Sequence, residues 1–592
     1  MPQRNRYVNV ISQIQDRARF SPSSVAVQCN NISVSFGELE RRSTAVAAAI
    51  IEKGIKPRDC VGLFAGRSPE LIVGLLGILK AGALYLPLDP NYPKSRNSFS
   101  VAETNCKLAL TGQSIESPAD IGTELLSISE AEGEFRNAMP LAGPSAGSDE
   151  PAYIIYTSGS TGRPNGVLGL NGPLANYIRW LRGHIAVTSR DRVLNISSIS
   201  FDPSLRDILV PLSAGAALVI LPQADAKNAL AYIECIRKQQ VTKLLSITPT
   251  LLRRLCALDE PAGESLKAIL TCGEPLPYGL AHLARMKFGP STKIFNMYGP
   301  TECTMTTTVF EVENDVAGKQ GLVPIGFPRD GTEVYLLGDD GREVPDGAIG
   351  EIHIGGSGLA GGYLNRPELM RQRFIRWSHA PGSSPLLFKT GDFGRRSVDG
   401  VLMFEGRIDD QVKIRGERIE IGEIEAAVAG LADEVGVVVL PEGAYAFAVA
   451  GSRQENIKQQ VLAACRDKLS AVAVPREVFL LEGLPHTPSG KIDRKILRDY
   501  VLLWKARQTY VSPVTGLEKK IALIWKEILV TSEFGIDTDF VAAGGDSMHA
   551  ASIANRLSSL LALDIPSYLI IEAMTIRNLA AIIESANQAS VV

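Results

Sequence analysis

The sequence predicts an α/β protein that ends in a small all-helical domain, and two patterns carry this prediction. Between about residues 35 and 404, short apolar runs alternate with amphipathic stretches long enough for helices. Four of these runs are typical of buried strands, at residues 60–65, 152–156, 217–221 and 243–247. Such alternation favours α/β architecture with largely parallel sheets. After residue 513 only helical patterns occur, at 517–529, 547–563, 567–571 and 576–585, which predict a four-helix bundle.

The length of the chain, 592 residues, favours several folding units. We expect a large domain over residues 1–408. A smaller α+β unit over residues 409–504 has its own alternation of strands and helices. A polar linker at 505–513 then leads into the helical domain at 514–592.

Composition excludes several classes of partner. The formal net charge of -3 gives no reason to expect nucleic acid or an anionic membrane surface. Residues 1–19 are polar and mixed, without the charged-then-apolar pattern expected of a signal segment. The most apolar stretch, residues 71–88, contains Lys80 and several glycines, and indicates a buried helix and strand instead of a membrane span. The eight cysteines show no Cys-x-x-Cys pair and no zinc-type spacing, which favours reduced thiols in a cytoplasmic protein.

The segment at residues 156–166 is dense in glycine, serine and threonine and follows an apolar run. Glycine lets backbone N–H groups turn toward an anion, and hydroxyl groups add donors, so this composition suits a polyphosphate. The segment lacks the Gly-Lys-Ser/Thr of a Walker A loop. The alternative for such a segment, taken alone, is a flexible surface turn.

Further segments occur in a fixed order around this loop and carry a resemblance. They lie at residues 35–39, 79–89, 201–204, 296–302, 350–367, 389–392, 406–416 and 489–494. With the phosphate loop, they resemble the adenylate-forming superfamily, specifically the adenylation domains of nonribosomal peptide synthetases. The resemblance covers nearly the whole chain. It implies a large adenylate-forming core and a small mobile α+β subdomain.

The segment at residues 540–550 contains Gly-Gly-Asp followed by Ser547 and an apolar helical pattern. It resembles the phosphopantetheine attachment site of a peptidyl carrier domain, so the helical domain is expected to be a carrier. Ser547 would bear the arm whose thiol accepts the activated acyl group. A serine here also suits a helix cap, a role that is compatible with attachment of the arm.

The resemblance implies an ATP site and a magnesium ligand. Tyr298 would lie against the adenine face, Asn296 would bind the base edge, and Asp392 would accept the ribose hydroxyls. Glu302 would hold Mg²⁺, which prefers carboxylate and phosphate oxygens. The full set expected at the nucleotide is Thr157, Ser158, Gly159, Ser160, Thr161, Gly162, Gly273, Glu274, Asn296, Tyr298, Gly299, Thr301, Asp392 and Arg407. Taken singly, Tyr298 could be a core residue, Asp392 a turn former and Glu302 a surface charge.

Two residues outside this set are expected to serve the reaction sequence. Lys491 would stabilise the charge that builds when a carboxylate attacks the α-phosphate, because a positioned ammonium lies between two anions. Asp409 corresponds to the hinge about which the small subdomain swings, so that Lys491 leaves and the thiol enters. The alternatives are an exposed turn residue for Lys491 and a charged loop residue for Asp409.

The expected substrate is an amino acid. Asp202 matches the aspartate that binds the substrate ammonium in amino-acid-activating relatives, and a carboxylate in an apolar pocket needs a cationic partner. The other pocket positions implied by the resemblance are Pro203, Arg206, Ser246, Leu270, Cys272, Met297, Met305 and Thr306. Arg206 could pair with an acceptor on the substrate or with Asp207 outside the pocket. An acidic, a β-amino and a small neutral amino acid all remain open.

Two positions depart from the family pattern. Asn165 stands where lysine is common in the phosphate loop, which costs roughly 1.5–3 kcal/mol at most, and Asn171 stands where histidine is common. Rival interpretations are a coenzyme A ligase for a free acid and a degenerate carrier or scaffold protein. The expected partners are an amino-acid substrate, a phosphopantetheinyl transferase and a downstream condensing or tailoring enzyme. We expect neither nucleic acid nor membrane as a partner.

Overall fold

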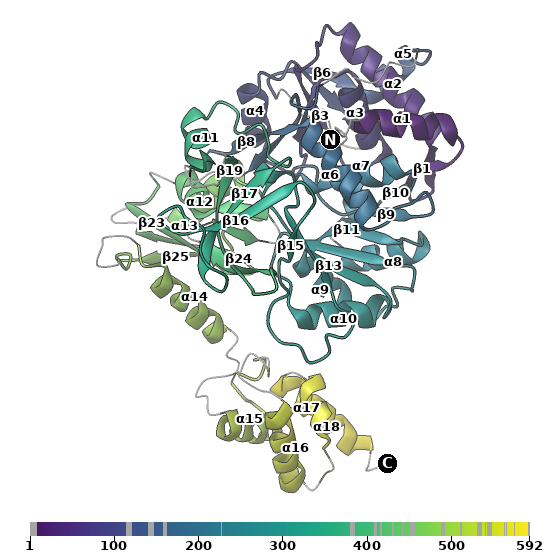
Figure 1. The fold of residues 1–592 in the computed structure, drawn as a ribbon. Coiled ribbons are helices and arrows are strands. Elements are labelled where there is room, and N and C mark those ends of the chain that lie inside the picture. The colour runs from purple at the N-terminus through teal and green to yellow at the C-terminus, as the bar shows by residue number, and fades with distance from the viewer. Residues whose placement is uncertain are drawn as a thin grey trace. The chain divides into compact units, whose positions relative to one another are not determined.

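The computed structural model describes residues 9–589 except for short segments. Those segments are 114–120, 140–146, 158–162, 227, 379–384, 408–410, 415–416, 429–430, 441, 450–455, 487–491, 509–511, 530–534, 539, 541–546, 562, 564 and 574. The chain forms two compact units, residues 1–480 and 481–592, and each is described by itself (Figure 1). Among the described residues, no helix combines the length and the apolar character needed to cross a membrane.

A six-stranded sheet in the first unit has the order β6-β5-β3-β4-β7-β8. Its strands are β3 (Cys60–Phe64), β4 (Leu84–Leu88), β5 (Leu108–Thr111), β6 (Glu124–Ser127), β7 (Pro151–Thr157) and β8 (Asn165–Leu170). All neighbours are parallel except β7 and β8. The apolar stretch at residues 71–88 forms helix α3 (Pro69–Lys80) and β4, as the sequence predicts.

A nine-stranded sheet has the order β15-β14-β13-β12-β11-β9-β10-β1-β2. Its strands are β1 (Val25–Cys29), β2 (Ile32–Ser35), β9 (Arg192–Asn195), β10 (Ala217–Ile220), β11 (Lys243–Ile247), β12 (Ala268–Cys272), β13 (Lys293–Tyr298), β14 (Thr308–Val312) and β15 (Phe327–Pro328). The strands from β1 to β13 in this order are parallel, and antiparallel strands close both edges. The predicted α/β fold with largely parallel sheets is confirmed.

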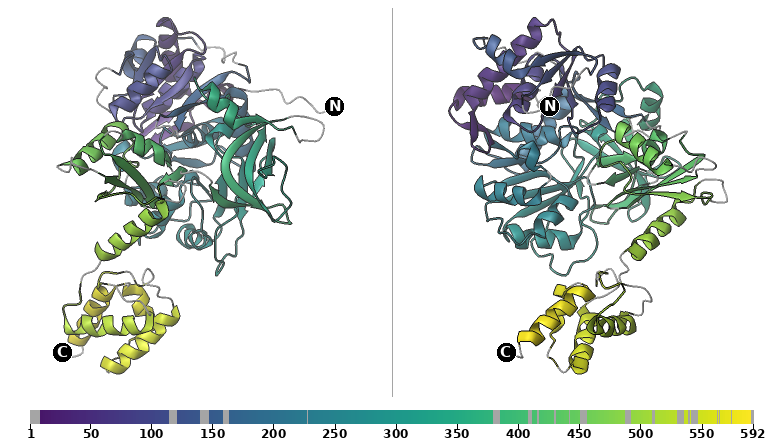
Figure 2. Two further views of the ribbon diagram at one scale, coloured as in Figure 1. Left: turned by 90° about the vertical axis from the view of Figure 1, so that its left-hand side faces the viewer. Right: turned by 180° about the vertical axis from the view of Figure 1, so that it is seen from behind.

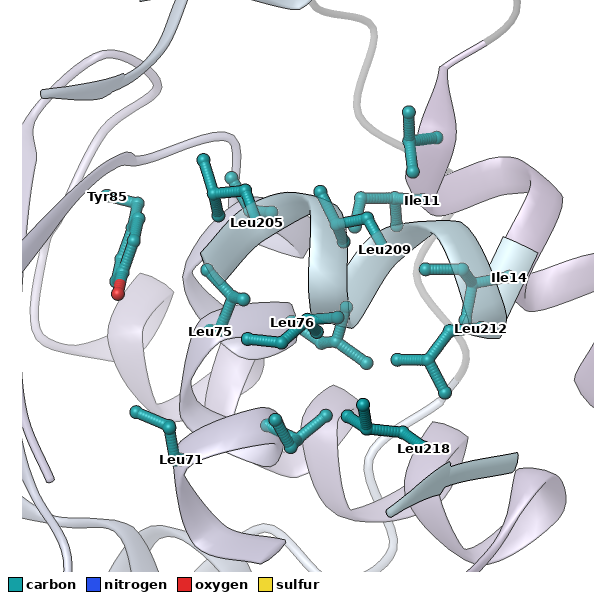
Figure 3. Close-up of a cluster of buried hydrophobic side chains, with 14 of the residues drawn as sticks. Ile11, Ile14, Leu71, Leu75, Leu76, Tyr85, Leu205, Leu209, Leu212 and Leu218 are labelled. Atoms are coloured by element: carbon teal, nitrogen blue, oxygen red, sulfur yellow. The ribbon is translucent and has the colours of Figure 1, made fainter. Parts of the chain in front are cut away.

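Helices fill the space between the two sheets and surround them. The helices of this region are α1 (Val10–Phe20), α2 (Phe36–Glu52), α4 (Lys94–Glu103), α5 (Ile128–Glu134), α6 (Asn171–His184), α7 (Pro203–Ala214), α8 (Ala229–Lys238), α9 (Pro249–Cys256) and α10 (Tyr278–Phe288), with α3 and a 3₁₀ turn at Gln223–Asp225. Figure 3 shows leucines of α3 and α7 interdigitating with Ile11 and Ile14 of α1. Leu76, Leu209 and Leu218 are each at most 1% exposed, so α7 is anchored in the core along most of its length.

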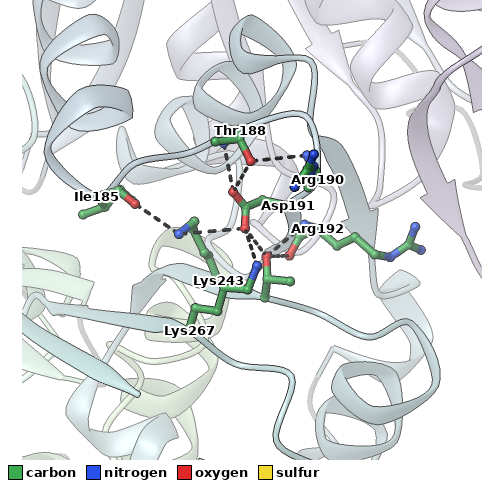
Figure 4. Close-up of polar contacts among 8 residues, drawn as sticks. Ile185, Thr188, Arg190, Asp191, Arg192, Lys243 and Lys267 are labelled. Carbon is green, nitrogen blue, oxygen red and sulfur yellow. Dashed lines mark hydrogen bonds and ion pairs between the residues drawn. The ribbon is translucent and has the colours of Figure 1, made fainter. Parts of the chain in front are cut away.

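An ion cluster fixes the amino ends of two parallel strands (Figure 4). The Asp191 carboxylate accepts hydrogen bonds from the backbone N–H of Thr188 at 2.9 Å and from the Thr242 hydroxyl at 2.9 Å. The ammonium of Lys243 lies 3.9 Å from the same carboxylate. Asp191 precedes β9 and Thr242 precedes β11, so the cluster sets the register of these strands. Their carboxyl ends therefore reach the same edge of the sheet.

The rest of the first unit is two smaller β regions. A curved sheet, visible in Figure 2, contains β16 (Thr332–Leu337), β17 (Ile349–Gly356), β18 (Phe374–Arg376), β19 (Leu386–Arg396) and β20 (Leu402–Arg407), with helix α11 (Pro367–Arg373) beside it. An α+β part follows, with β21 (Gln411–Ile414), β22 (Glu417–Glu420), β23 (Glu434–Leu440), β24 (Gly443–Val449), β25 (Val478–Leu481), α12 (Ile421–Ala427) and α13 (Ile457–Lys468). This part matches the small α+β region expected from the sequence.

The second unit contains the predicted helical domain, and from residue 494 onward the only regular structure among its described residues is helical. Its helices are α14 (Arg494–Gln508), α15 (Gly516–Leu529), α16 (Ser547–Leu561), α17 (Ser567–Ala573) and α18 (Ile576–Ala589). Trp525 and Phe540 form an edge-to-face pair in the core of the last four helices, with ring centroids 5.1 Å apart. Residues 505–508, which we expected in a polar linker, continue α14. They contain neither glycine nor proline, so nothing in their sequence ends the helix.

Candidate active site

A cavity of about 1310 Å³ lies at the carboxyl ends of the parallel strands in the nine-stranded sheet. Strands β11, β12 and β13 end there, and the residues directly after them, Thr248, Gly273 and Gly299, line the cavity. Ligands of open parallel sheets bind at this edge, where loops and strand ends leave a crevice. The volume is sufficient for a nucleotide together with a small second substrate.

Helix α7 brings two opposite charges to one end of this cavity. Pro203 occupies the first position of the helix, where its missing N–H costs nothing. Gly215, with a φ of 81°, ends the helix in a left-handed cap. Asp202 and Arg206 are four residues apart, so they lie on the same face, and both line the cavity.

Most of the predicted substrate pocket lies together. The cavity wall includes Asp202, Pro203, Arg206, Ser246, Cys272, Met297 and Met305. Leu270 lies in the hydrophobic core between the sheets, and Thr306 lies behind the wall, where it contacts Arg206. Thr304 and Met305 have φ values of 57° and 69°, and two successive non-glycine residues in the left-handed region are typical of functional loops.

The guanidinium of Arg206 points into the pocket wall and is fully buried, with 0% of the residue exposed. Its Nε donates to the Ser246 hydroxyl at 2.9 Å. Its Nη1 donates to the Tyr177 hydroxyl at 3.1 Å and to the Thr306 hydroxyl at 3.2 Å. Its Nη2 contacts the Cys272 sulfur at 3.1 Å. Burial acts to lower the pKa of Arg206, but Tyr177, Cys272 and Asp207 raise it overall, so this side chain is a cation.

Asp207 accepts from three described donors, one of which, the Ser246 hydroxyl, is also bound by Arg206. Its Oδ2 accepts from the backbone N–H groups of Ile196 and Ser197 at 2.9 and 3.0 Å, and its Oδ1 accepts from the Ser246 hydroxyl. Burial raises the pKa of Asp207 although Arg206 acts in the opposite direction. Ser246 therefore stands between the two ions, accepting from one and donating to the other.

The other end of the cavity carries the residues predicted for the nucleotide. Asp392 accepts from the Tyr298 hydroxyl at 2.6 Å through Oδ2 and from Arg407 through Oδ1. Burial, and next the Asp392 carboxylate, raise the pKa of Tyr298, so the hydroxyl remains a donor. A Cβ on Gly299 would lie 2.6 Å from the Thr307 nitrogen, which explains the glycine beside this wall.

Asn296 lines the cavity, but its amide hydrogens are used within the protein. Its Nδ2 donates to the carbonyl oxygens of Val323 and Pro324 at 3.2 and 2.9 Å, so both amide hydrogens are bound to the backbone. In this structure the side chain fixes the loop beside the cavity. Glu274 offers an acceptor instead: its Oε2 binds the Thr250 N–H at 2.8 Å, while its buried Oε1 has no hydrogen-bond partner among the described residues.

Glu302, the predicted metal ligand, lies in a 3₁₀ turn at Thr301–Cys303. It is fully buried and accepts from the Tyr363 hydroxyl at 2.7 Å. Thr301 lines the cavity directly before it. Within the described ranges, no group of three or more His, Cys, Asp and Glu side chains could hold a metal ion by itself. A magnesium site here would therefore combine Glu302 with phosphate oxygens and water.

Several predicted residues lie outside the described residues. These are Ser158, Gly159, Ser160, Thr161, Gly162, Lys491 and Asp409. Thr157 ends β7 at the cavity and donates to the carbonyl of Asn165 at 3.4 Å. Asn171 begins α6 and donates to the Glu150 carbonyl at 3.0 Å. Ser547 is the first residue of α16, a helix start that suits a phosphate-bearing group.

Models of three known families match parts of this chain. The sequence model of the AMP-binding enzymes matches residues 14–364, more than half of the chain. The chain belongs to the AMP-binding enzyme family. The model of the AMP-binding enzyme C-terminal domain matches residues 423–491, and that of the phosphopantetheine attachment site matches residues 519–583. The resemblance to an adenylation domain fused to a carrier domain is thereby confirmed.

Curated relatives of this AMP-binding enzyme are peptide synthases. Bacitracin synthase 3 of Bacillus licheniformis is 36% identical over 554 residues, which cover 92% of this chain and 8% of that protein. Tyrocidine synthase 1 of Brevibacillus parabrevis is 33% identical over 554 residues, covering 92% of this chain and 50% of that protein. The chain thus spans about half or less of the length of these relatives.

Solved structures of two-domain proteins share the fold of this AMP-binding enzyme. One is holo-PA1221, an NRPS protein containing adenylation and PCP domains bound to a vinylsulfonamide inhibitor. It has a TM-score of 0.73 and 25% identity, covering 98% of this chain and 97% of that chain. The artificially fused adenylation-PCP di-domain NpsA-ThdA from Klebsiella oxytoca has a TM-score of 0.71 and 25% identity, covering 79% and 93%.

Sequence reasoning missed one residue of this site, Tyr177. It comes from α6, is fully buried, and its hydroxyl joins Arg206 to Thr306. Its place among apolar residues of a helix gave no signal, because a buried tyrosine in such a pattern is ordinarily a core residue. Tyr177 reaches Arg206 because α6 packs against α7 in the folded chain, which the sequence does not indicate.

Proposed function

We propose that this chain activates an amino acid with ATP, releasing pyrophosphate, and then loads the aminoacyl group onto its own carrier segment. The observation that carries the proposal is the presence on one chain of an AMP-binding core and a phosphopantetheine attachment site. The carboxylate of Asp202 at the cavity wall supports an amino acid as substrate, because an ammonium group complements it.

The cavity wall fits ATP. Glu274 presents a buried acceptor without a partner among the described residues, which suits an N–H donor such as the amino group of the base. Tyr298 supplies an aromatic face, and Asp392 retains lone pairs beyond those that Tyr298 and Arg407 use, so it can accept from ribose hydroxyls. Glycines and hydroxyl residues at 158–162 would hold the phosphates.

The donor chemistry also fits Mg²⁺. Glu302 would be its protein ligand, and the ion would neutralise charge on the transferring phosphate. Tyr363 donates to one oxygen of Glu302 and so fixes the orientation of the carboxylate. Thr301 would place its hydroxyl or backbone beside the same phosphates.

In the first step, a carboxylate oxygen of the amino acid bonds to the α-phosphorus of ATP. The bond from that phosphorus to pyrophosphate breaks, and the electron pair leaves with pyrophosphate. Asp202 would hold the ammonium and thereby orient the carboxylate. Lys491 would stabilise the negative charge on the phosphoryl oxygens.

In the second step, AMP leaves as the acyl group passes to the carrier. The phosphopantetheine arm, attached to Ser547 by a phosphopantetheinyl transferase, supplies the thiol that receives the acyl group as a thioester. Asp409 would act as the hinge that removes Lys491 before this step. A downstream condensing or tailoring enzyme would then take the loaded group.

The test uses the full chain, first treated with a phosphopantetheinyl transferase and coenzyme A. Amino-acid-dependent exchange of pyrophosphate into ATP reports the first step, and intact mass reports loading. We expect Lys491→Ala to lower exchange by about 10²-fold or more, and Ser547→Ala to keep exchange but gain no mass. Exchange that does not depend on any amino acid would contradict the proposal. Faster transfer to free coenzyme A than to the carrier would favour a coenzyme A ligase.

A further inference from the structure

The charge of Arg206 has no anion in contact with it in the part of the chain that the structure describes. Its hydrogen-bond partners are three neutral hydroxyl groups, of Ser246, Tyr177 and Thr306, and the sulfur of Cys272. No ion pair within 4.0 Å joins its nitrogens to a described carboxylate. A fully buried cation whose described hydrogen-bond partners are all neutral is costly, so an anion in contact with it would stabilise the site.

Asp207 does not supply that anion directly. Its two oxygens already accept from two backbone N–H groups and from the Ser246 hydroxyl. The same hydroxyl accepts from Arg206 Nε at 2.9 Å, so it separates the two charges. Asp207 thus holds Ser246 in place, and Ser246 in turn aligns the guanidinium. The remaining donors of Arg206 point toward other groups.

The weakest partner of Arg206 lies on the cavity side. Nη2 contacts the Cys272 thiol at 3.1 Å, and Nη1 lies 3.9 Å from the Met297 sulfur. Thiol and thioether sulfurs are weak acceptors, and Cys272 is half-buried at the cavity wall. A carboxylate that displaces the thiol gains a charge-assisted hydrogen bond from Nη2.

The separation between Asp202 and Arg206, the two charged residues of the pocket, limits the length of a ligand that binds both. Asp202 lies four residues before Arg206 on α7, which corresponds to an axial separation of about 6 Å. The other described residues of this part of the wall, Pro203, Ser246, Cys272, Met297 and Met305, are neutral. The pocket therefore presents one negative and one positive group, about one helical turn apart. An ammonium and a carboxylate on the same small molecule match this pair.

We propose that the substrate is an amino dicarboxylic acid, whose ammonium binds Asp202, whose one carboxylate binds Arg206, and whose other carboxylate reacts with ATP. This inference rests on the proposed function, because it names the class of amino acid that the same cavity takes. The number of carbon atoms between the two carboxyl groups of the substrate decides which of them reaches the α-phosphate of ATP. Neutral amino acids leave Arg206 without an anion, and basic ones place a like charge against it.

The test compares each acid with its neutral amide on the unmodified full chain. Pyrophosphate exchange is measured with aspartate, glutamate and 2-aminoadipate and with their side-chain amides, besides the other proteinogenic amino acids. We expect one acid to exceed its amide by about 10²- to 10³-fold in kcat/KM, the range for loss of one partner of a buried charge pair. This comparison needs no mutation, so it does not depend on the folding of a variant.

Arg206→Gln then assigns the preference to this residue. The variant keeps donors for the hydroxyl groups but removes the charge, so the ratio of acid to amide is expected to fall to about tenfold or less. The matched control is Arg285→Gln. Arg285 is also buried, on α10, and donates to the backbone carbonyls of Val312 and Glu313, away from the cavity wall. This control is expected to keep the ratio of the unmodified chain.

The outcomes separate this inference from the proposed function. Exchange with a neutral or basic amino acid in place of the three acids would overturn the inference and leave the proposed function intact. Silence with all three acids would overturn it as well. Exchange with no amino acid, together with no calorimetric binding of ATP, would overturn the proposed function itself. An acid preference that survives in Arg206→Gln would show that another group holds the carboxylate.

Discussion

Asp392 offers the sharpest test of the nucleotide end of the cavity. It lies on β19 opposite Arg407 of β20 and is 6% exposed. Arg407 donates to one of its oxygens, and the Tyr298 hydroxyl donates to the other at 2.6 Å. In the proposed function the same carboxylate also accepts from ribose hydroxyls of ATP. The residue therefore has a structural role and a binding role that one substitution can separate.

Asp392→Asn keeps the shape of the side chain and removes its charge. The favourable orientation keeps Oδ1 toward Arg407 and lets Nδ2 donate to the Tyr298 oxygen, so both protein contacts survive in neutral form. A hydrogen bond to a charged group contributes about 1.5–3 kcal/mol, against about 1 kcal/mol for a neutral one. For ribose hydroxyls that exchange a charged acceptor for a neutral one, we expect ATP binding weaker by about 0.5–2 kcal/mol, which is about 2- to 30-fold in Kd.

The assay is calorimetric titration of the full chain with ATP and Mg²⁺, beside a thermal unfolding scan. The matched control is Glu405→Gln on the same hairpin. Glu405 accepts from Arg395 at 2.8 Å, but this pair is partly exposed and contributes about 0–1 kcal/mol. The control is expected to bind ATP as the unmodified chain does. Unchanged ATP affinity in Asp392→Asn, with a lowered Tm, would refute the reasoning and leave Asp392 only as a link between β19, β20 and Tyr298.

Three further substitutions test other parts of the molecule. Gly299→Ala places a Cβ 2.6 Å from the Thr307 nitrogen, so we expect a displaced loop and a KM for ATP raised tenfold or more in the exchange assay; an unchanged KM would contradict this. Glu302→Gln keeps the bond from Tyr363 but loses the charge, so the Mg²⁺ concentration for half-maximal exchange should rise while Tm changes little; the same Mg²⁺ dependence in both proteins would exclude Glu302 as ligand. Burial raises the pKa of Glu423 to about 7, although nearby Arg96 acts to lower it. The folded protein therefore holds this proton more tightly than the unfolded chain does. The free energy of unfolding gains from it fully below the ordinary carboxyl pKa, and this gain is lost as the pH rises through 7. Tm measured from pH 5 to 8 should therefore fall less in Glu423→Gln than in the unmodified chain, and parallel curves would disprove the assignment.

Much of the fold could be predicted because the signals are local. The run at residues 243–247 forms β11, and all five of its residues are buried, which is why its sequence does not alternate between apolar and polar residues. Helices α15 and α16 begin within one residue of the predicted positions. The two-residue edge strand β15 could not be predicted, because only its pairing with β14 makes Phe327–Pro328 a strand. The extension of α14 to Gln508, in contrast, agrees with the local sequence, because residues 505–508 are good helix formers without glycine or proline.

The sequence predicted most of the residues that line this part of the cavity wall, but not the orientation of their side chains. The four-residue spacing of Asp202 and Arg206 predicts a common helix face, and the structure has both at the cavity wall. The direction of the guanidinium depends on Tyr177, Ser246 and Thr306, which come from three separate elements, so the sequence left Asp207 as an equal alternative. The amide of Asn296 shows the same limit. Its partners lie 27 and 28 residues further along the chain, and no local pattern indicates them.

The two ends of the cavity are built in different ways, and this has a consequence for specificity. The end proposed for the nucleotide combines β13 with the hairpin of β19 and β20, whereas the two charges proposed to bind the substrate are Asp202, the N-cap of α7, and Arg206 in its first turn. That turn is packed into the core between the two sheets, with Leu205 and Leu209 at most 1% exposed. A change at Arg206 therefore alters a buried hydrogen-bond network as well as the pocket. Substrate preference in this chain should shift only together with stability, while ATP affinity, which depends on residues of other elements, stays nearly constant.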